Sequence, residues 1–120
     1  MQYLLLIYGP ESARASMTDA EHQALYGEYF AFTNAIKQSG HWVGGNPLQF
    51  VRTASSVRVR DGKISTTDGP FAETREQLGG YFLIEANDQA EANAIAARIP
   101  GARLGTIEVR PVMAIGTPPR

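Results

Sequence analysis

The sequence predicts a small α+β fold in which two helices cover one face of a sheet. Three observations lead to this prediction. Two short apolar runs, at residues 2–8 and 81–84, suit strands. Two helix-start signals occur at 18–21 and 88–91. A tight Asp-Gly turn occurs at 61–62. In chain order these signals alternate between strand and helix, which is typical of a mixed fold.

The first strand is expected at residues 2–8, where the run QYLLLIY is closed by Gly9-Pro10 and is too short to suit a helix. Both of its alternating faces are apolar, so this strand is expected to be covered on both sides. Residues 11–17 are polar and are predicted to be irregular. A helix is then expected from the capping box at 18–21 to Ser39-Gly40, with an apolar stripe formed by Leu25, Tyr29, Phe32 and Ile36.

The middle of the chain predicts extended structure and one hairpin. Residues 41–43 suit a short strand, which the glycine and proline residues of 44–47 are expected to break, and 48–51 is expected to be extended again. The alternating run 57–60 continues through Asp61-Gly62 into 63–66. Because an Asp-Gly pair tolerates the positive φ values of a type I′ turn, this segment predicts a β-hairpin.

The last third repeats the strand–helix–strand order. A strand at 81–84 precedes a helix whose apolar face is Ala92, Ile95, Ala96 and Ile99, and Pro100-Gly101 ends it. The closing strand is predicted at 106–115, where Pro111 suggests an edge or a bulge. The whole order is the βαββαβ order of a ferredoxin-like fold with an inserted hairpin, in one domain of residues 1–115 followed by a tail, 116–120.

Composition limits the function. The 120 residues carry a net charge of −1 and their basic residues are scattered, which argues against nucleic acid and against an anionic membrane as partners. The absence of cysteine excludes a disulfide framework, a zinc–thiolate site and a cysteine nucleophile. Two histidines without ligand spacing predict no metal site. No targeting signal is recognised, so a cytoplasmic location is the default expectation.

A homodimer is expected for two reasons. Only 19% of the residues are charged, which is low for a small monomer. The first strand and residues 81–84 are apolar on both sides, whereas two helices cover only one face of the predicted sheet. A second copy packed sheet to sheet covers the other face, and gives a dimeric α+β barrel.

Residues 68–85 read DGPFAETREQLGGYFLIE, a long and unusual motif. It resembles the DGPF group of the YCII-related domain family, and the runs MQYLLLIYG, HWVGGNPLQ, VRVRDGK and RLGTIEVRPVM resemble that group as well. The resemblance implies a ferredoxin-like domain that pairs into a dimeric barrel. It also implies a small-molecule enzyme or enzyme-like binding protein, acting without a cofactor by proton abstraction, elimination or isomerisation on a small organic acid or aromatic.

The resemblance equally allows a non-catalytic alternative. In this second interpretation the chain is a dimeric sensor or interaction module associated with transcriptional regulation, since members of the group are thought to accompany sigma-factor-like regulators. The environment of Asp68 separates the two. A carboxylate that only caps residues 70–73 favours the module, and one that faces a cavity beside a histidine or an arginine favours the enzyme.

Three residues are the catalytic candidates: Asp68, His22 and His41. Asp68 stands in a turn, where it either caps residues 71–73 or serves as a carboxylate base. His22 lies in the first turn of the first long helix, which disfavours the imidazolium and leaves a neutral base, although a lone histidine in a first turn is more often a surface residue. His41 either packs against Trp42 or points into a pocket, expected between this helix and the sheet. Either histidine could pair with Asp68.

Seven further residues are candidates for binding. Arg75 and Glu76 belong to a segment of alternating charge, where an arginine can bind a carboxylate in bidentate fashion or form surface ion pairs. Arg110 is expected to face solvent or to pair with Asp68 or Glu76. Gly79-Gly80 predicts a bulge or a close backbone approach. The complete binding set is Tyr8, Tyr26, Phe71, Arg75, Glu76, Tyr81 and Arg110.

Overall fold

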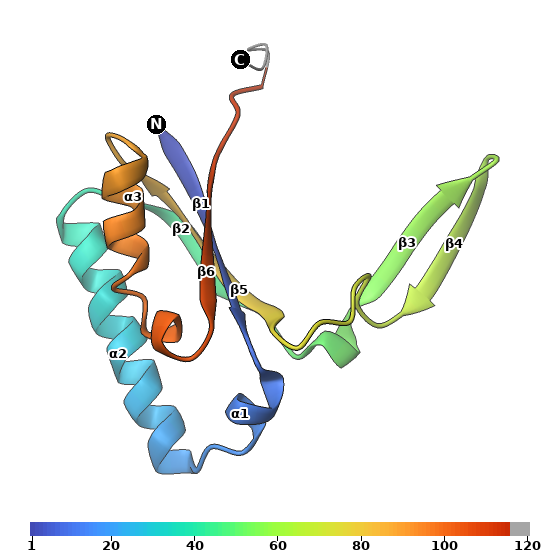
Figure 1. Ribbon diagram of the computed structural model, residues 1–120, viewed down its shortest axis with the longest axis horizontal. Helices are drawn as coiled ribbons and strands as arrows, with labels where there is room; N and C mark the ends of the chain where they lie inside the picture. Colours follow the sequence, from blue (N-terminus) through green and yellow to red (C-terminus); the bar gives the residue numbers. More distant parts are fainter. Residues whose placement is uncertain (116–120) are drawn as a thin grey trace.

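The computed structural model describes residues 1–115, and the predicted tail, 116–120, lies outside the described residues. A four-stranded antiparallel sheet has the strand order β2-β5-β1-β6. Its strands are β1 (Gln2–Gly9), β2 (Trp42–Pro47), β5 (Gln77–Glu85) and β6 (Thr106–Pro111). Helices α2 (Asp19–Gln38) and α3 (Gln89–Ala96) cover one face (Figure 1). The predicted ferredoxin-like order is confirmed.

Both helices begin where the sequence predicts. Thr18 Oγ1 accepts a hydrogen bond from Glu21 N at 3.1 Å, and the Glu21 carboxylate accepts one from Thr18 N at 3.1 Å, which completes the capping box. At α3, Asp88 accepts from Glu91 N at 2.8 Å, but the Glu91 carboxylate turns to the backbone of Asn87 instead. The second box is therefore only half formed.

The hydrophobic core lies between the helices and the sheet. The side chains on one face of β1 and β5 meet Phe32 and Ile36 of α2 and the apolar face of α3. Burial of these apolar side chains is the main contribution that holds the two layers together. The fully or almost fully buried residues are Tyr3, Leu5, Phe32, Ile36, Phe82, Ile84, Ala86, Ala92, Ile95, Ala96 and Ile99.

The opposite face of the sheet has no helix over it. Successive side chains of a strand point to opposite faces. Since Leu5 and Phe82 point into the core, the neighbours that alternate with them point away from it. We call this the open sheet face. It is formed by the apolar side chains of Leu4, Leu6, Leu78, Tyr81 and Leu83.

A β-bulge interrupts the pairing of the two central strands. Ile7 pairs with Gly80 and Tyr8 pairs with Leu78, so Gly79 is the additional residue. This confirms the bulge expected at Gly79-Gly80. A side chain at Gly80 would stand 3.1 Å from the Asn46 carbonyl oxygen, so this glycine also allows the close approach of β2.

The inserted hairpin projects from the rest of the fold as a separate two-stranded sheet. Strands β3 (Ser55–Arg60) and β4 (Lys63–Asp68) follow the short 3₁₀ helix η1 (Val51–Thr53). Positive φ values at Asp61 (51°) and Gly62 (74°) fit the type I′ turn that the sequence predicts. We call residues 55–68 the arm. It extends on the side of the sheet that the helices leave uncovered (Figure 1).

Four segments differ from the expectation. Residues 11–15, predicted irregular, form the short helix α1 (Glu11–Ala15), and residues 100–103 form the 3₁₀ helix η2 (Pro100–Arg103). Strand β2 runs through the predicted break at 44–47, because pairing with β5 satisfies its backbone. Strand β6 ends at Pro111 rather than at 115.

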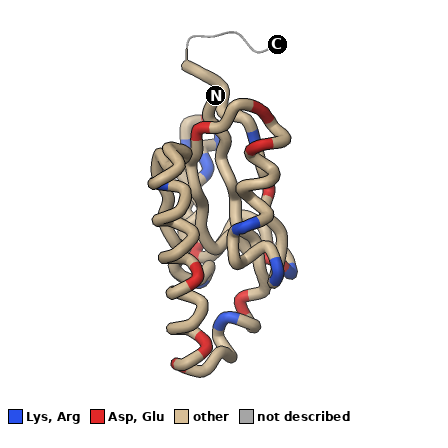
Figure 2. The backbone as a smooth tube through the Cα atoms, turned by 90° about the vertical axis from the view of Figure 1, so that its left-hand side faces the viewer, with Lys and Arg blue, Asp and Glu red and all other residues tan. Residues whose placement is uncertain are grey.

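Surface charge is dispersed over the fold. Lys and Arg alternate in space with Asp and Glu along the tube, and no face visible in Figure 2 carries a block of one sign. Within residues 1–115, no helix is long and apolar enough to cross a membrane.

Candidate functional site

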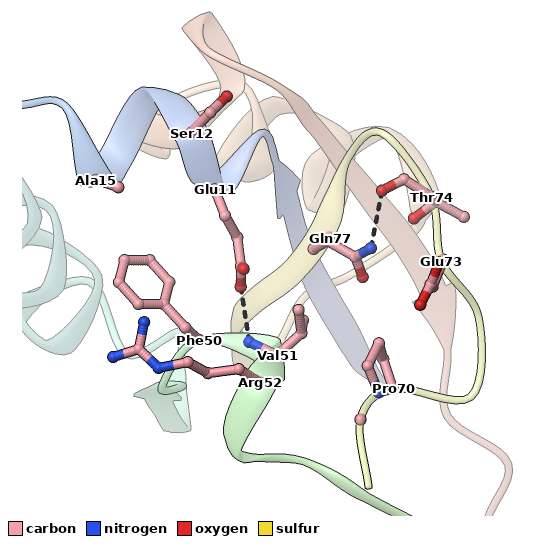
Figure 3. Close-up of a pocket in the computed structure, with 11 residues that line it drawn as sticks. Glu11, Ser12, Ala15, Phe50, Val51, Arg52, Pro70, Glu73, Thr74 and Gln77 are labelled. Carbon is pink, nitrogen blue, oxygen red and sulfur yellow. Dashed lines mark hydrogen bonds between the residues drawn. The ribbon is translucent and has the colours of Figure 1, made fainter.

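A pocket of about 620 Å³ lies where α1, η1 and the loop between β4 and β5 meet. We call residues 69–76 the DGPF loop. Figure 3 shows the three walls: α1 on one side, residues 50–52 beneath, and the loop opposite. The pocket is open to solvent and its lining mixes charged, polar and apolar groups: Glu11, Ser12, Ala15, Phe50, Val51, Arg52, Gly69, Pro70, Glu73, Thr74 and Gln77.

A second hollow, of about 530 Å³, lies between α3 and β6. It is lined by alanine, aliphatic and amide side chains, and its described lining carries no charged group. A site that recognises or activates a polar molecule needs convergent polar or charged groups. The pocket at the DGPF loop is therefore the stronger candidate.

Helix α1 is held to the pocket by one carboxylate. Glu11 Oε2 accepts a hydrogen bond from the backbone N–H of Val51 at 2.8 Å, across 40 residues of sequence. Glu11 also lies in the first turn of α1, where a negative charge is favourable. Sequence reasoning missed both α1 and Glu11. The available signal was Pro10 followed by the helix-forming run at 11–15.

Two guanidinium groups converge on one aromatic ring beside the pocket. Arg14 Cζ lies 4.2 Å and Arg52 Cζ 5.4 Å from the centroid of the Phe50 ring. Among the residues that the structure describes, no carboxylate forms an ion pair with either arginine. Cation–π contacts place these charges without neutralising them. The charges thus stay available to an anionic ligand.

Turn chemistry fixes the two ends of the DGPF loop. Gly69 has a φ of 100°, and its backbone N–H donates to the Ala54 carbonyl at 2.7 Å. The Ser56 hydroxyl donates to the Gly69 carbonyl at 2.9 Å. At the other end, Gln77 Nε2 donates to the Thr74 carbonyl at 2.8 Å. The loop is therefore anchored to the base of the arm and to the start of β5.

Asp68 is the last residue of β4, directly before the loop. It pairs in register with Ser55, it is exposed, and it does not line the pocket. No helix follows at 71–73, and within residues 1–115 no hydrogen bond to its carboxylate is found, so the capping interpretation is wrong. Its carboxylate also faces no histidine or arginine partner of the described chain. Within one copy, Asp68 therefore neither caps residues 70–73 nor faces a cavity beside a histidine or an arginine.

The two histidines lie at opposite ends of α2. His22 is in the first turn and stacks on Tyr26, with 6.2 Å between the ring centroids. His41 follows the helix and contacts Ser39 Oγ at 2.6 Å and Glu91 Oε1 at 3.1 Å. The 20 residues of α2 correspond to roughly 30 Å along the helix axis. Neither histidine lines the pocket, and the structure does not bring either one to Asp68 within a single copy.

The remaining predicted binding residues are distributed over three places. Tyr8, Tyr81 and Arg110 belong to the open side of the sheet, and Tyr81 accepts a hydrogen bond from Asn46 Nδ2 at 3.0 Å. Tyr26 is exposed on α2. The Arg110 guanidinium donates to Glu108 of the same strand, not to Asp68 or Glu76.

The three candidates within the DGPF loop do not enter the pocket. Glu76 Oε1 accepts from the Thr106 hydroxyl at 2.8 Å, which ties the loop to β6. Phe71 is exposed, with Arg58 Cζ 5.2 Å from its ring centroid. Arg75 is also exposed. Asp68, Phe71, Arg75 and Glu76 are each adjacent in sequence to a residue of the lining, but none of the four lines the pocket.

A family model described as the YCII-related domain matches residues 1–115. The chain belongs to the YCII-related domain family. An uncharacterised protein of Rhizobium meliloti (strain 1021) is 31% identical over 114 residues, which cover 93% of this chain and 92% of the relative. The YCII-related domain thus spans both the sheet and the arm.

His41 and Glu91 form a structural contact with a measurable pH dependence. A hydrogen bond from the Asn87 backbone holds the pKa of Glu91 below its usual value, and His41 lowers this pKa further. A carboxyl with a lower pKa in the folded state stabilises the fold above its unfolded pKa of about 4.5, and this contribution is lost as the pH falls through the folded pKa. We expect Glu91→Gln to reduce the free energy of unfolding at pH 7 more than at pH 3.

Urea unfolding at the two pH values measures this effect. Glu73→Gln is the matched control, because Glu73 is an exposed carboxylate of the DGPF loop. An equal loss of stability at pH 7 and pH 3 in Glu91→Gln would show that ionisation of this carboxylate does not stabilise the fold.

Proposed function

We propose that the chain binds a small organic acid in the pocket at the DGPF loop, with the carboxylate of the ligand paired to Arg52. The observation that carries the proposal is the guanidinium of Arg52 in the pocket wall, held against Phe50 and without a carboxylate partner in residues 1–115. An arginine offers a planar pair of donors that matches a carboxylate. Phe50 and Pro70 supply apolar surface for the body of the ligand.

Catalysis in this proposal is proton transfer without a cofactor. Asp68 is the proposed base, because it directly precedes Gly69 of the pocket lining, whereas Glu11 of the lining already accepts a hydrogen bond from Val51 N. Its carboxylate accepts a proton from a carbon beside a carbonyl group of the ligand, and the C–H electron pair moves into the carbonyl to form an enolate. Return of the proton to the same carbon gives exchange with solvent, and return to another carbon gives isomerisation.

The position of Asp68 also favours a second candidate function. Its carboxylate is exposed and outside the pocket lining, which is the arrangement expected of a non-catalytic dimeric sensor or interaction module. In that case the pocket binds the acid but transfers no proton.

One experiment tests binding and separates the two candidates. Calorimetric titration with succinate, benzoate and 2-oxobutyrate is expected to show saturable binding of at least one acid. Arg52→Ala is expected to weaken binding at least about tenfold, which corresponds to the loss of one charge-assisted pair. The affinity of Arg52→Lys should fall between those of the wild type and Arg52→Ala. Arg60→Ala, which removes an arginine at the tip of the arm, is the matched control. Unchanged affinity in Arg52→Ala, or no binding at millimolar acid, would refute the proposal.

Proton transfer is read in the same samples by deuterium incorporation at C3 of 2-oxobutyrate in D₂O. Exchange above the background rate supports the enzyme, and Asp68→Asn is expected to abolish it without loss of binding. Exchange at the full rate in Asp68→Asn excludes the base role. Binding without any exchange favours the sensor module.

We also propose a homodimer, which the open sheet face supports. Leu4, Leu6 and Leu83 belong to the two central strands and do not contribute to the core. An apolar patch that is rimmed by polar residues, here Asn46, Glu108 and Arg110, is typical of a protein interface. A two-fold pair of such faces buries both patches at once.

A further inference from the structure

We infer that the arm is a clasp that packs its apolar face against a second copy of this chain. The inference rests on the proposed dimer and adds to it a contact outside the sheet. It also assigns Asp68, at the base of the same arm face, to the boundary between the two copies.

The pairing register gives the arm two different faces. Val59 lies opposite Ile64, and Val57 lies opposite Thr66. Because side chains alternate along a strand, Val57, Val59 and Ile64 share one face. Their exposed fractions are 63%, 57% and 75%. The other face carries the charged residues Arg58, Arg60 and Lys63. Three aliphatic side chains on one face of a projecting hairpin are thus left in water.

An isolated two-stranded hairpin is at best marginally stable in water. In the part of the chain that the structure describes, β3 and β4 pair only with each other, and no arm residue belongs to the hydrophobic core. Its attachments are the hydrogen bonds at its base, from Gly69 to Ala54 and from Ser56 to Gly69. A persistent arm therefore needs a surface on which to bury its valines and Ile64.

The direction of the arm favours a second copy of the chain as the surface that buries its valines and Ile64. The arm extends on the uncovered side of the sheet (Figure 1). The radius of gyration is 16.4 Å, compared with roughly 14 Å for a compact chain of this length. A partner that covers the open sheet face lies on the side from which the arm projects. The sheet and the arm then form one continuous interface.

Interface area supports the same partner. Strand spacing and rise give the open sheet face a planar area of roughly 450 Å², and the arm face roughly 200 Å². The arm face therefore enlarges the area that a second copy can contact by nearly half. A larger contact area favours a stable interface.

Asp68 lies on the apolar face of the arm. It pairs with Ser55, and alternation along β3 and β4 puts both residues on the side of Val57 and Ile64. Its neighbour Gly69 lines the pocket. Docking of the arm therefore brings the Asp68 carboxylate against the partner, at the edge of its own pocket. In this arrangement the site around Asp68 is complete only when two copies pair. This accounts for the absence of a histidine or arginine partner for the Asp68 carboxylate within residues 1–115 of one copy.

Sedimentation velocity over a dilution series tests the clasp. Val59→Asp is expected to raise the dissociation constant of the dimer at least about tenfold, because a charge replaces an aliphatic contact. Ser65→Asp adds the same charge to the opposite face of the same arm and is expected to change it less than about threefold. Hydrogen exchange supplies a second measurement: amides of 57–66 should be protected in the dimer and lose protection in Val59→Asp.

Each outcome decides the inference. A wild-type dimer that Val59→Asp does not weaken would overturn the clasp and leave the sheet-face dimer intact. Equal weakening by Val59→Asp and Ser65→Asp would overturn the assignment of the apolar face. A wild-type monomer at every concentration would overturn both the clasp and the dimer, but not ligand binding in the pocket.

Discussion

Replacement of Leu4 by aspartate is expected to convert the proposed dimer into monomers. Leu4 belongs to the central strand β1, opposite Leu83 on one side and Arg110 on the other, and points away from the core. Because a two-fold interface contains each substitution twice, two carboxylates would lose solvent there, each with Arg110 as its cross-strand neighbour. At about 2 kcal/mol for each desolvated carboxylate, we expect the dissociation constant to rise by about three orders of magnitude.

Leu104→Asp is the matched control for this variant. Leu104 is an exposed leucine after η2, outside the open sheet face, and its replacement should leave the dissociation constant unchanged. Sedimentation equilibrium measures both variants, and circular dichroism verifies that each has folded. A Leu4→Asp dimer as tight as the wild type would show that the open sheet face is not the interface.

Replacement of Gly105 by alanine is expected to destabilise the fold more than any other glycine substitution proposed here. A Cβ at this position would overlap the Tyr8 carbonyl oxygen and stand 2.9 Å from Gly9 Cα. Both are backbone atoms of β1, so no side chain can rotate away. The start of β6 must then move off the central strand, at a cost of about 3 kcal/mol or more.

Gly27→Ala is the paired substitution with the opposite expectation. Gly27 lies inside α2, and no heavy atom stands within 4 Å of its added Cβ. Alanine is the better helix former by about 0.5–1 kcal/mol, so this variant should be slightly more stable than the wild type. Thermal unfolding of the two variants and the wild type measures this difference in stability. A Gly105→Ala melting temperature equal to that of the wild type would contradict the packing of β6 on β1.

The main elements of the fold could be predicted because their signals are local. The capping box at 18–21, the stripe ending at Ile36 and the Asp61-Gly62 turn each lie within a few residues of one another. Helix α1 could not be predicted, since five residues show no repeated apolar stripe and the helix is fixed by Glu11 reaching Val51. Strand β2 was predicted to break at 44–47 because its glycines and proline are poor strand formers. Its pairing with β5 overrides that preference.

The position of the pocket was not predicted. The sequence predicted a pocket between the long helix and the sheet, where the structure packs the hydrophobic core. The motif at 68–85 contains the loop that forms one wall of the observed pocket. The opposite walls come from residues 11–15 and 50–52, which only the tertiary fold brings near. Arg52 was not predicted, since its proposed role depends on the distant residues of α1 and of the DGPF loop that close the pocket around it. The expected pairing of a histidine with Asp68 came from the family resemblance, which did not specify which histidine takes part, and α2 holds the two histidines far apart.

The central claim is that the pocket at the DGPF loop binds a small organic acid. Backbone amide chemical shifts of ¹⁵N-labelled protein, followed during titration with the acid that binds in calorimetry, test it most directly. The largest changes are expected in three segments: 11–15, 50–52 and 69–77. Shifts confined to the surroundings of His41 and Glu91, or to the hollow between α3 and β6, would contradict the claim.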